Sequence, residues 1–308
     1  MFVLITLIPA FLALGAFSLA IPNPSAFPAG FRKCLFYDDF SEWPWRSTPS
    51  PDRWTIDHGT SYPGGPPNWG TGEIQTYTSN RRNIRITPRG TLQITPHRDA
   101  DGNWTSARIE TTADYDFACP VGHRLRVEAN IKLGDNPESK QLGIWPAFWT
   151  LGSDYRGNYW NWPGVGEVDI LESMNGVDKL WHVVHCGAAP GGPCDEFNGI
   201  SSTATFQRGV WHTVAWEVDR RHASLDPMDD KMSWFVDGKL TWSLTGSDVG
   251  DADAWEALTA NKKMILLNVA VGGGFPDGVA GMKTPTEDTK GGKGASMEVD
   301  YVSVYSTA

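Results

Sequence analysis

Apolar and polar residues alternate along much of this chain, and this two-residue period is the strongest constraint on its fold. The alternation runs, for example, through residues 124–131, 212–218 and 297–305. Successive side chains of a β-strand point to opposite faces, so each of these segments predicts a strand with one buried face. Turn residues separate the strands, as at 62–72, and a helical period fits only residues 251–260. Short strands separated by turns predict an all-β sandwich or barrel.

Composition favours a globular chain with a neutral partner. Gly (33) and Pro (21) together stay below the share of about 25–30% that indicates disorder. We find neither a linker nor an internal repeat, so residues 21–308 are predicted to form one domain. The net charge of -10, without a run of Lys or Arg longer than a dipeptide, argues against a nucleic-acid partner.

The first 20 residues are apolar and uncharged, and we interpret them as a secretory signal cleaved after Ala20. The alternative is a membrane anchor, because about 20 apolar residues can just span a bilayer. Pro9 and Gly15 interrupt the segment and favour cleavage, and no later segment is apolar enough to span. We therefore expect a secreted, extracellular protein with no membrane anchor. A secreted chain would also meet the glycosylation machinery, for which Asn103 begins an Asn-Trp-Thr sequon.

The chain has four cysteines, Cys34, Cys119, Cys186 and Cys194, which could form two disulfides in an oxidising compartment. Residues 187–193, between the last two, are rich in Gly and Pro and can turn the chain back on itself. We therefore pair Cys186 with Cys194, which leaves Cys34 to pair with Cys119. The alternatives are four unpaired thiols, which secretion disfavours, and a zinc site, for which the sequence lacks a Cys-x-x-Cys pair.

Three carboxylates, Glu167, Asp169 and Glu172, interrupt an otherwise apolar predicted strand. Alternation places Glu167 and Asp169 on one face of the strand. Glu172 would then point into the core, where an unpaired carboxylate is costly. A β-bulge at Ile170 or Leu171 would return Glu172 to the acidic face, and bulges are frequent beside active sites. We therefore predict a bulged strand with three acids on one face.

Two carboxylates on one face suit glycoside hydrolysis, because one can attack the anomeric carbon while the other protonates the departing oxygen. The alternative is a solvated acidic face on an edge strand. Trp160 and Trp162 lie just upstream and favour the first interpretation, since the apolar C–H faces of sugar rings stack on indoles.

An ordered set of short motifs accompanies the acidic strand, which has the sequence EVDILE at residues 167–172. Together the motifs lie between Asp38 and Tyr305, and they comprise residues 72–78, 106–109, 144–149, 267–273 and 299–305. With these motifs the chain resembles glycoside hydrolase family 16, the laminarinase and lichenase group. The family signature is E-x-D-x-x-E, and the acidic strand matches its laminarinase-like, bulged form. The stretch from His185 to Cys194 is similar to a fungal subgroup.

The resemblance implies a β-jelly-roll sandwich of the concanavalin A-like lectin and glucanase type, with a concave substrate cleft. It implies that Glu167 is the nucleophile, Glu172 the general acid and then the base, and Asp169 the neighbour that positions Glu167. Crowding three carboxylates should raise at least one pKa. We therefore expect Glu172 to stay protonated while Glu167 is ionised.

Substrate-binding residues also follow from the resemblance. Trp162 matches a stacking residue, Arg108 matches a cleft arginine, and His185 lies on the strand expected beside the acidic one. The alternatives are a core indole, a solvated arginine and a structural histidine. Trp145 and Trp149 are four residues apart on one strand face. We expect one of them to border the cleft and the other to pack, and the sequence leaves open which.

Two positions depart from the family pattern, and a third indicates a metal. Gly72 stands where laminarinases commonly have Asn, and Phe275 stands where many have Trp; both positions face substrate in the family. Asp300 matches a structural calcium position, with carbonyls from a turn such as that at Gly90. The alternative is an Asp that caps an exposed strand. Two-carboxylate catalysis needs no cofactor, so calcium would only stabilise the fold.

We therefore expect a secreted, monomeric, endo-acting, retaining β-glucanase whose partner is a β-1,3 or mixed β-1,3/1,4 glucan. The missing Trp at Phe275 leaves an endo-β-1,3-galactanase as an alternative, and a transglycosylase would use the same covalent intermediate. A carbohydrate-binding protein without catalysis is a further alternative, because fold does not fix function. The intact Glu167 and Glu172 argue against it.

Overall fold

The computed structural model describes residues 27–41, 44–222 and 226–308. Residues 1–20, which we interpret as a secretory signal, lie outside this range. Within the described residues, no helix is both long enough and apolar enough to cross a membrane.

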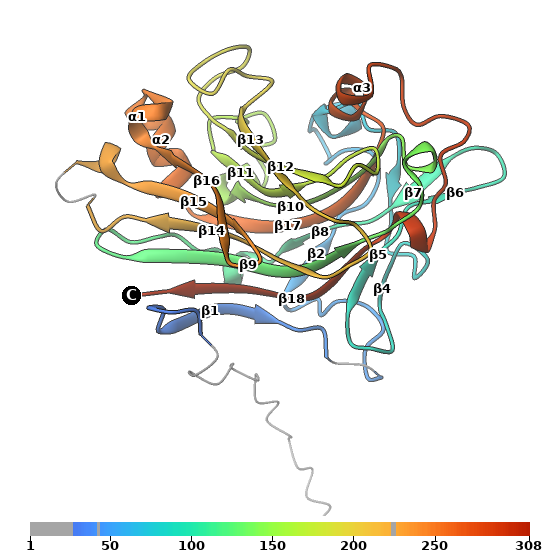
Figure 1. Cartoon of the computed structure of the whole chain (residues 1–308), viewed down its shortest axis with the longest axis horizontal. Coiled ribbons are helices and arrows are strands. Elements are labelled where there is room, and N and C mark those ends of the chain that lie inside the picture. The colour runs from blue at the N-terminus through green and yellow to red at the C-terminus, as the bar shows by residue number, and fades with distance from the viewer. Residues whose placement is uncertain (1–26, 42–43, 223–225) are drawn as a thin grey trace, which may run out of the picture.

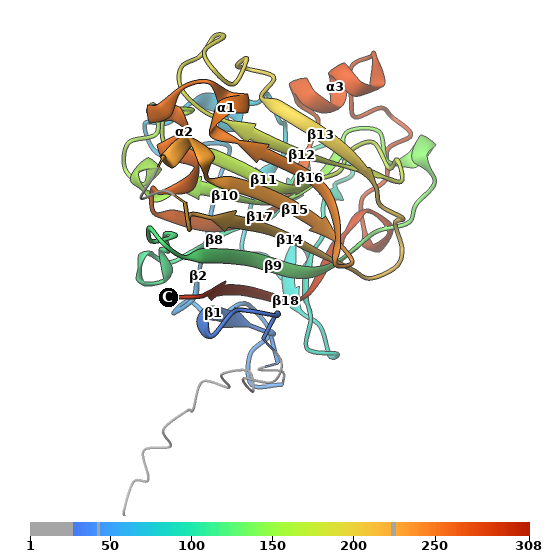
Figure 2. The same cartoon turned by 60° about the vertical axis from the view of Figure 1, so that its left-hand side comes forward.

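Two antiparallel sheets stack into a β-sandwich, as the sequence predicts (Figure 1). The first sheet has eight strands: β1 (Lys33–Asp38), β4 (Ile84–Ile86), β5 (Leu92–Ile94), β9 (Arg124–Leu133), β14 (His212–Asp219), β15 (Lys231–Val236), β16 (Lys239–Thr245) and β18 (Met297–Ser306). They run side by side in the order β16, β15, β14, β9 and β18, and β18 also pairs with β1 and β5 (Figure 2). The alternating segments at 124–131, 212–218 and 297–305 are therefore three adjacent strands.

The second sheet has seven strands: β2 (Trp54–Ile56), β8 (Arg108–Thr111), β10 (Ile144–Gly152), β11 (Glu167–Glu172), β12 (Lys179–His185), β13 (Ile200–Thr205) and β17 (Lys263–Val271). Their order is β13, β12, β11, β10, β17, β8 and β2. The acidic strand β11 thus lies inside the sheet, so the edge-strand interpretation is wrong. A small third sheet contains β3 (Thr76–Tyr77), β6 (His97–Arg98) and β7 (Trp104–Ser106).

The core lies between the two large sheets. Trp216 and Val218 of β14 belong to the same buried cluster as Phe148 of β10. A core indole also joins the sheets directly beneath the acids, because Nε1 of Trp234 donates to the carbonyl of Asp169 (3.3 Å). This hydrogen bond ties the backbone of the acidic strand to the first sheet on the core side.

In the part of the chain that the structure describes, three short α-helices lie outside the sheets: α1 (Gly246–Val249), α2 (Ala252–Thr259) and α3 (Gly274–Ala280). α2 confirms the helix predicted at 251–260, and the side chain of Asp251 caps its first turn. The fully buried amine of Lys263 donates to the carbonyls of Ala257 in α2 (2.7 Å) and Gly166 (3.3 Å). Burial lowers the pKa of Lys263 to about 7. This lysine joins the end of α2 to the residue before β11.

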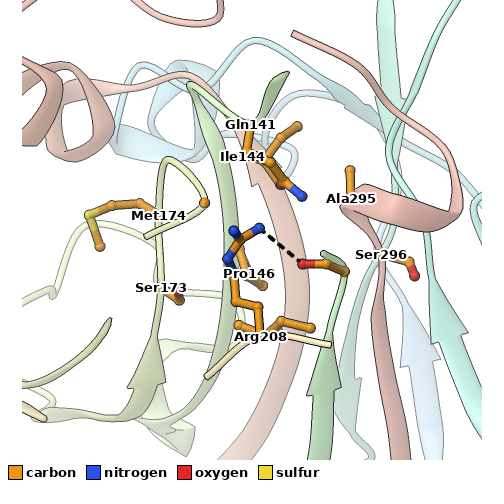
Figure 3. Close-up of a pocket in the computed structure, with 11 residues that line it drawn as sticks. Gln141, Ile144, Pro146, Ser173, Met174, Arg208, Ala295 and Ser296 are labelled. Atoms are coloured by element: carbon orange, nitrogen blue, oxygen red, sulfur yellow. Dashed lines mark hydrogen bonds between the residues drawn. The ribbon is translucent and has the colours of Figure 1, made fainter. Parts of the chain in front are cut away.

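A small pocket lies where the end of β9, the start of β10 and the segment after β11 meet (Figure 3). Its volume of about 10 Å³ is at the lower limit for one water molecule. Arg208 reaches into it, and Nη1 donates to the carbonyls of Gly134 (3.2 Å) and Asn136 (2.8 Å). A sugar ring cannot enter this space, so the pocket belongs to the packing of the fold.

One of the two predicted disulfides is present. Cys186 and Cys194 are bonded, with their Cα atoms 5.4 Å apart. The predicted pairing of Cys34 with Cys119 is wrong, because both are free thiols. Cys34 lies on β1, whereas Sγ of Cys119 contacts the carbonyl of Val218 on β14 (3.8 Å), and β18 and β9 lie between those strands. At about 4.8 Å per strand, β1 and β14 are about 14 Å apart. A disulfide tolerates at most about 7 Å between Cα atoms.

We expect chemical counting to find two free thiols per chain, namely Cys34 and Cys119. The measurement is reaction with a thiol reagent in denaturant, without reductant, so that the buried Cys119 is also accessible. Cys34→Ser should reduce the count to one. A count near zero for the unsubstituted chain would show that the two cysteines pair after all.

Candidate active site

β11 carries the three acids and contains the predicted bulge. Its pairing with β10 shifts between Phe148 and Trp149, because Ile170 is an extra residue opposite this point. Ile170 and the following Leu171 both lie in the core. The shift returns Glu172 to the face that carries the other two acids, which is the outer face of the second sheet.

Two indoles hold the outer acids. Nε1 of Trp162 donates to Oε2 of Glu167 (2.9 Å), and Nε1 of Trp145 donates to Oε1 of Glu172 (2.8 Å). Trp162 is half-buried, so it is not a fully enclosed core indole. Of the two tryptophans on β10, Trp145 borders the acids, whereas Trp149 packs against a smaller apolar cluster.

Asp169 lies between these acids and faces a histidine. Nε2 of His185 is 3.8 Å from Oδ2 of Asp169, and that oxygen accepts no hydrogen bond from any described residue. The opposite nitrogen, Nδ1, donates to Oε2 of Glu196 (2.7 Å). His185 therefore lies beside the acids. The structural histidine of β12 is His182, which is fully buried and bonded through both ring nitrogens.

Burial and mutual repulsion raise the pKa values of the three carboxyl groups. Burial raises the pKa of Glu172 to about 7. Burial, together with the charges of Glu167 and Glu172, raises the pKa of Asp169 well above its ordinary value. Burial also raises the pKa of Glu167, although the charge of His185 and the N–H of Trp162 oppose the rise. The three groups titrate as a coupled cluster, and Glu172 is suited to release a proton near neutral pH.

Arg108 is buried rather than solvated, with only 6% of its surface exposed. Its Nε donates to Oδ2 of Asp57 (3.0 Å). The guanidinium lies 4.6 Å and 4.9 Å from the ring centres of Trp69 and Trp149. Its positive charge also lowers the pKa of Glu167. Arg108 therefore acts on the site through its charge and by holding the aromatic side chains around it.

Sequence reasoning missed a further buried carboxyl group, that of Glu73. Its Oε2 accepts from Nε2 of Gln75 (2.6 Å) and from the hydroxyl of Tyr77 (2.7 Å). The same hydroxyl accepts from Nδ2 of Asn268 (3.2 Å), whose Oδ1 accepts from Trp149 (2.8 Å). The available signal was the hydrogen-bonding side chain at every second position, 73, 75 and 77, because residues two apart in an extended chain share a face.

The two departures from the family pattern have clear structural settings. Phe275 lies on α3, and its ring meets Trp145 and Trp181 edge-on, with centroids 5.8 Å and 5.9 Å apart. It therefore borders the indole that holds Glu172. Gly72 has φ +78°, in the left-handed region that Gly and Asn adopt most readily. Gly in place of Asn thus keeps the backbone conformation and removes a side chain.

Asp300 and Asn103 lie apart from the acids. Asp300 is on β18 in the first sheet, where it lines an open groove of about 430 Å³. Burial and the charge of Asp39 raise the pKa of Asp300. The turn at Gly90 packs against the backbone of Phe40, next to Asp39. These carboxylate and carbonyl oxygens are the ligand type that Ca²⁺ prefers. Asn103 is exposed just before β7, as a glycosylation site must be.

One group of possible metal ligands lies in the acidic cluster itself. Atoms of Glu167, Asp169 and His185 come within 4.8 Å of one another. Trp162 and Glu196 already bond two of these side chains, and a two-carboxylate mechanism uses the acids directly on substrate. We therefore assign the cluster to nucleophilic attack and proton transfer.

Comparison with known proteins gives consistent matches. A family model described as "XgeA-like, catalytic GH16 domain" matches residues 75–209. The crystal structure of endo-1,3-beta-glucanase from Streptomyces sioyaensis is 44% identical, with a TM-score of 0.84, and the match covers 93% of this chain and 99% of that chain. The endo-beta-1,3-glucanase from Pyrococcus furiosus is 31% identical, with a TM-score of 0.66, over 90% of this chain and 94% of that chain.

Some curated relatives are much longer than this chain. The clotting factor G alpha subunit of Tachypleus tridentatus is 30% identical. The match covers 83% of this chain but only 32% of that relative. The chain likewise spans 40% of the glucan endo-1,3-beta-glucosidase A1 of Niallia circulans.

Trp145→Phe should raise the pKa of Glu172 by about one pH unit, because the lost N–H stabilises ionised Glu172. The measurement is a pH titration of the Glu carboxyl carbons by NMR. Trp211→Phe, in the groove of the first sheet that Asp300 also lines, is the matched control and should leave the titration unchanged. An unchanged or lower pKa in Trp145→Phe would show that the indole does not control this acid.

Proposed function

The chain belongs to glycoside hydrolase family 16, and on this basis we propose that it is an endo-acting β-glucanase that hydrolyses β-1,3 or mixed β-1,3/1,4 glucans with retention of configuration. The observation that carries the proposal is the bulged strand β11, which presents Glu167 and Glu172 on one face with separate indole donors. The two similar solved structures are both endo-1,3-β-glucanases, which supports the sugar and the linkage.

In this mechanism Glu167 attacks the anomeric carbon and Glu172 protonates the departing glycosidic oxygen. The raised pKa of Glu172, about 7, supports this role, because the group still carries its proton in weakly acidic solution. A covalent glycosyl-enzyme results. Glu172, now ionised, then takes a proton from the water that attacks the intermediate, which restores both groups.

Asp169 and His185 would control the charge of the nucleophile. The strongly raised pKa of Asp169 keeps it protonated, so it can donate a hydrogen bond to Glu167 instead of repelling it. Burial favours neutral His185, but its hydrogen bond to Glu196 and the nearby carboxylates raise its pKa. A protonated His185 in turn favours ionised Glu167. These two residues therefore favour the ionisation state that attack requires.

Aromatic side chains on both sides of the acids support sugar binding. Trp162 lies beside Glu167, and Trp145, Trp181 and Phe275 cluster beside Glu172. Their half-buried rings offer flat apolar surfaces on which the C–H faces of sugars can stack.

We further propose that residues 21–308 act as one secreted, monomeric catalytic domain without a membrane anchor. The apolar, uncharged residues 1–20 and the Cys186–Cys194 disulfide support secretion, because structural disulfides persist in oxidising compartments. The exposed Asn103 is then available for glycosylation. The acidic net charge of -10 favours a neutral polysaccharide over a nucleic acid as partner.

Glu167→Gln and Glu172→Gln should each abolish most turnover with the fold intact. Loss of the general acid alone should lower kcat by about 10²–10⁴-fold. The measurement is release of oligosaccharides by the purified protein from laminarin, mixed-linkage glucan, β-1,3-galactan and cellulose. Circular dichroism and the Tm check folding, and neither variant should melt earlier above pH 7, because Gln removes a buried charge.

The substrate panel separates the alternatives. Products from the first two polymers support the proposal and show the linkage required, whereas cleavage of galactan alone would mean that Phe275 marks a changed sugar site. Products longer than the starting oligosaccharide would indicate a transglycosylase. If no products are released from any of the four polymers, a carbohydrate-binding protein would be favoured. Near-normal activity of either variant would show that the substituted residue is not part of the mechanism.

Asp300 and Asp39 are proposed to hold a stabilising Ca²⁺ together with backbone carbonyls near Phe40. Adding Ca²⁺ should raise the Tm of the protein, and at a hundredfold excess over Kd the gain is about 2.7 kcal/mol. Asp300→Asn should abolish this response and leave kcat unchanged, since the site lies on the first sheet. A Tm that does not change between chelator and excess Ca²⁺ would contradict the proposal.

A further inference from the structure

A closed loop between β12 and β13 lies beside the acidic strand (Figure 1). The Cys186–Cys194 bond closes it. β12 pairs with β11 and ends at His185, directly opposite Glu167. The loop begins at the next residue, Cys186, and so starts beside the acidic strand. Its conformation therefore decides what lies next to the proposed nucleophile.

Glu196 anchors this loop from inside. Its side chain is fully buried, Oε1 accepts from the backbone N–H of Cys186 (2.8 Å), and Oε2 accepts from Nδ1 of His185 (2.7 Å). Glu196 also exchanges backbone hydrogen bonds with Gly191 across the loop. Both oxygens of the carboxylate are used within the protein, so Glu196 fixes the loop and leaves substrate contact to its neighbour.

That neighbour, Phe197, is 68% exposed. Its ring is nearly parallel to the ring of Trp162, with an interplanar angle of 11° and centroids 6.1 Å apart. Trp162 in turn donates its N–H to Glu167. Phe197 is thus stacked against the indole that holds Glu167, and it extends the aromatic surface of the site beyond Trp162. A single exposed Phe is common on protein surfaces. Phe197 differs because a cross-linked loop holds its ring parallel to an active-site indole, and this arrangement indicates a role in binding.

We propose that Phe197, stacked on Trp162, forms an additional subsite for a pyranose ring of the glucan chain. This inference rests on the proposed function, because its ligand is the same polysaccharide. The C–H face of one sugar would contact the exposed ring of Phe197. This sugar would lie one position farther from the acids than the sugar that contacts Trp162. The disulfide and Glu196 order the loop before substrate arrives, which lowers the entropy lost on binding.

Phe197→Ala tests the subsite without threatening the fold, since the side chain is mostly exposed. We expect the KM for a β-1,3-glucan polymer to rise about tenfold with kcat nearly unchanged. This pattern indicates the loss of a contact that binds the substrate and the transition state equally. The KM for the shortest oligosaccharides that the enzyme cuts should change little, because these substrates need not reach the subsite. Phe197→Tyr keeps the ring and should restore the original KM.

Leu240→Ala is the matched control. Leu240 is also exposed (49%) and apolar, but it lies on β16 of the first sheet, so its removal should change neither constant. An unchanged polymer KM in Phe197→Ala would overturn the subsite. A fall in kcat at constant KM would overturn it as well, because Phe197 would then act on the chemistry rather than on binding.

Direct binding keeps this test separate from the proposed function. If the unsubstituted protein cuts no polymer, the proposed function fails, and the Kd for soluble β-1,3-glucan still decides the subsite. Weaker binding by Phe197→Ala supports it, and equal or undetectable binding by both proteins overturns it.

The role of the loop is tested by removing the disulfide with Cys186→Ala and Cys194→Ala together. We expect the polymer KM to rise, because a loosened loop no longer holds Phe197 against Trp162. In the Phe197→Ala background the same change should add nothing, since both act through one contact. Additive effects on KM, or no effect of removing the disulfide, would show that the loop does not present Phe197.

Discussion

A buried carboxyl group needs either a hydrogen-bond donor or a proton, and this requirement shapes the outer face of the second sheet. The extra residue Ile170 turns all three acids of β11 away from the apolar core. Each outer acid then has its own indole donor, and Asp169, between them, keeps a proton. Without the bulge, Glu172 would have to be solvated or paired inside the core.

The choice of neutral donors preserves the acidity that hydrolysis requires. An arginine paired directly with Glu172 would lower its pKa by about 1–3 units and favour the loss of its proton. The guanidinium of Arg108 is instead bonded to Asp57 and lies against aromatic rings. Its charge reaches the cluster only at a distance, where it favours ionised Glu167. The two outer acids thus have different electrostatic surroundings on one strand.

Local features of this protein can be predicted from the sequence, whereas long-range pairings cannot. The strands and the bulge at Ile170 follow from alternation and from the cost of burying an acid, which a few residues reveal. The pairing of Cys34 with Cys119 rested on elimination, and it failed because the order of strands in the sheet decides which cysteines meet. Glu196 and the burial of Arg108 were hidden for the same reason. Each depends on segments that only the tertiary fold brings together, namely a loop that returns to β12 and tryptophans far apart in the chain.

The buried side chains of Glu172 and Lys263 make the stability of the fold depend on pH in opposite directions. Folding raises the pKa of Glu172 from 4.5 to about 7, so the stability it contributes is complete below pH 4.5 and lost as the pH rises to about 7. Folding lowers the pKa of Lys263 from 10.5 to about 7, so its contribution is complete above pH 10.5 and lost as the pH falls to about 7. Both contributions are smallest near neutrality. As far as these two groups decide, the protein is least stable near neutrality and more stable on either side of it, and in an acidic medium Glu172 also carries the proton that it donates in catalysis.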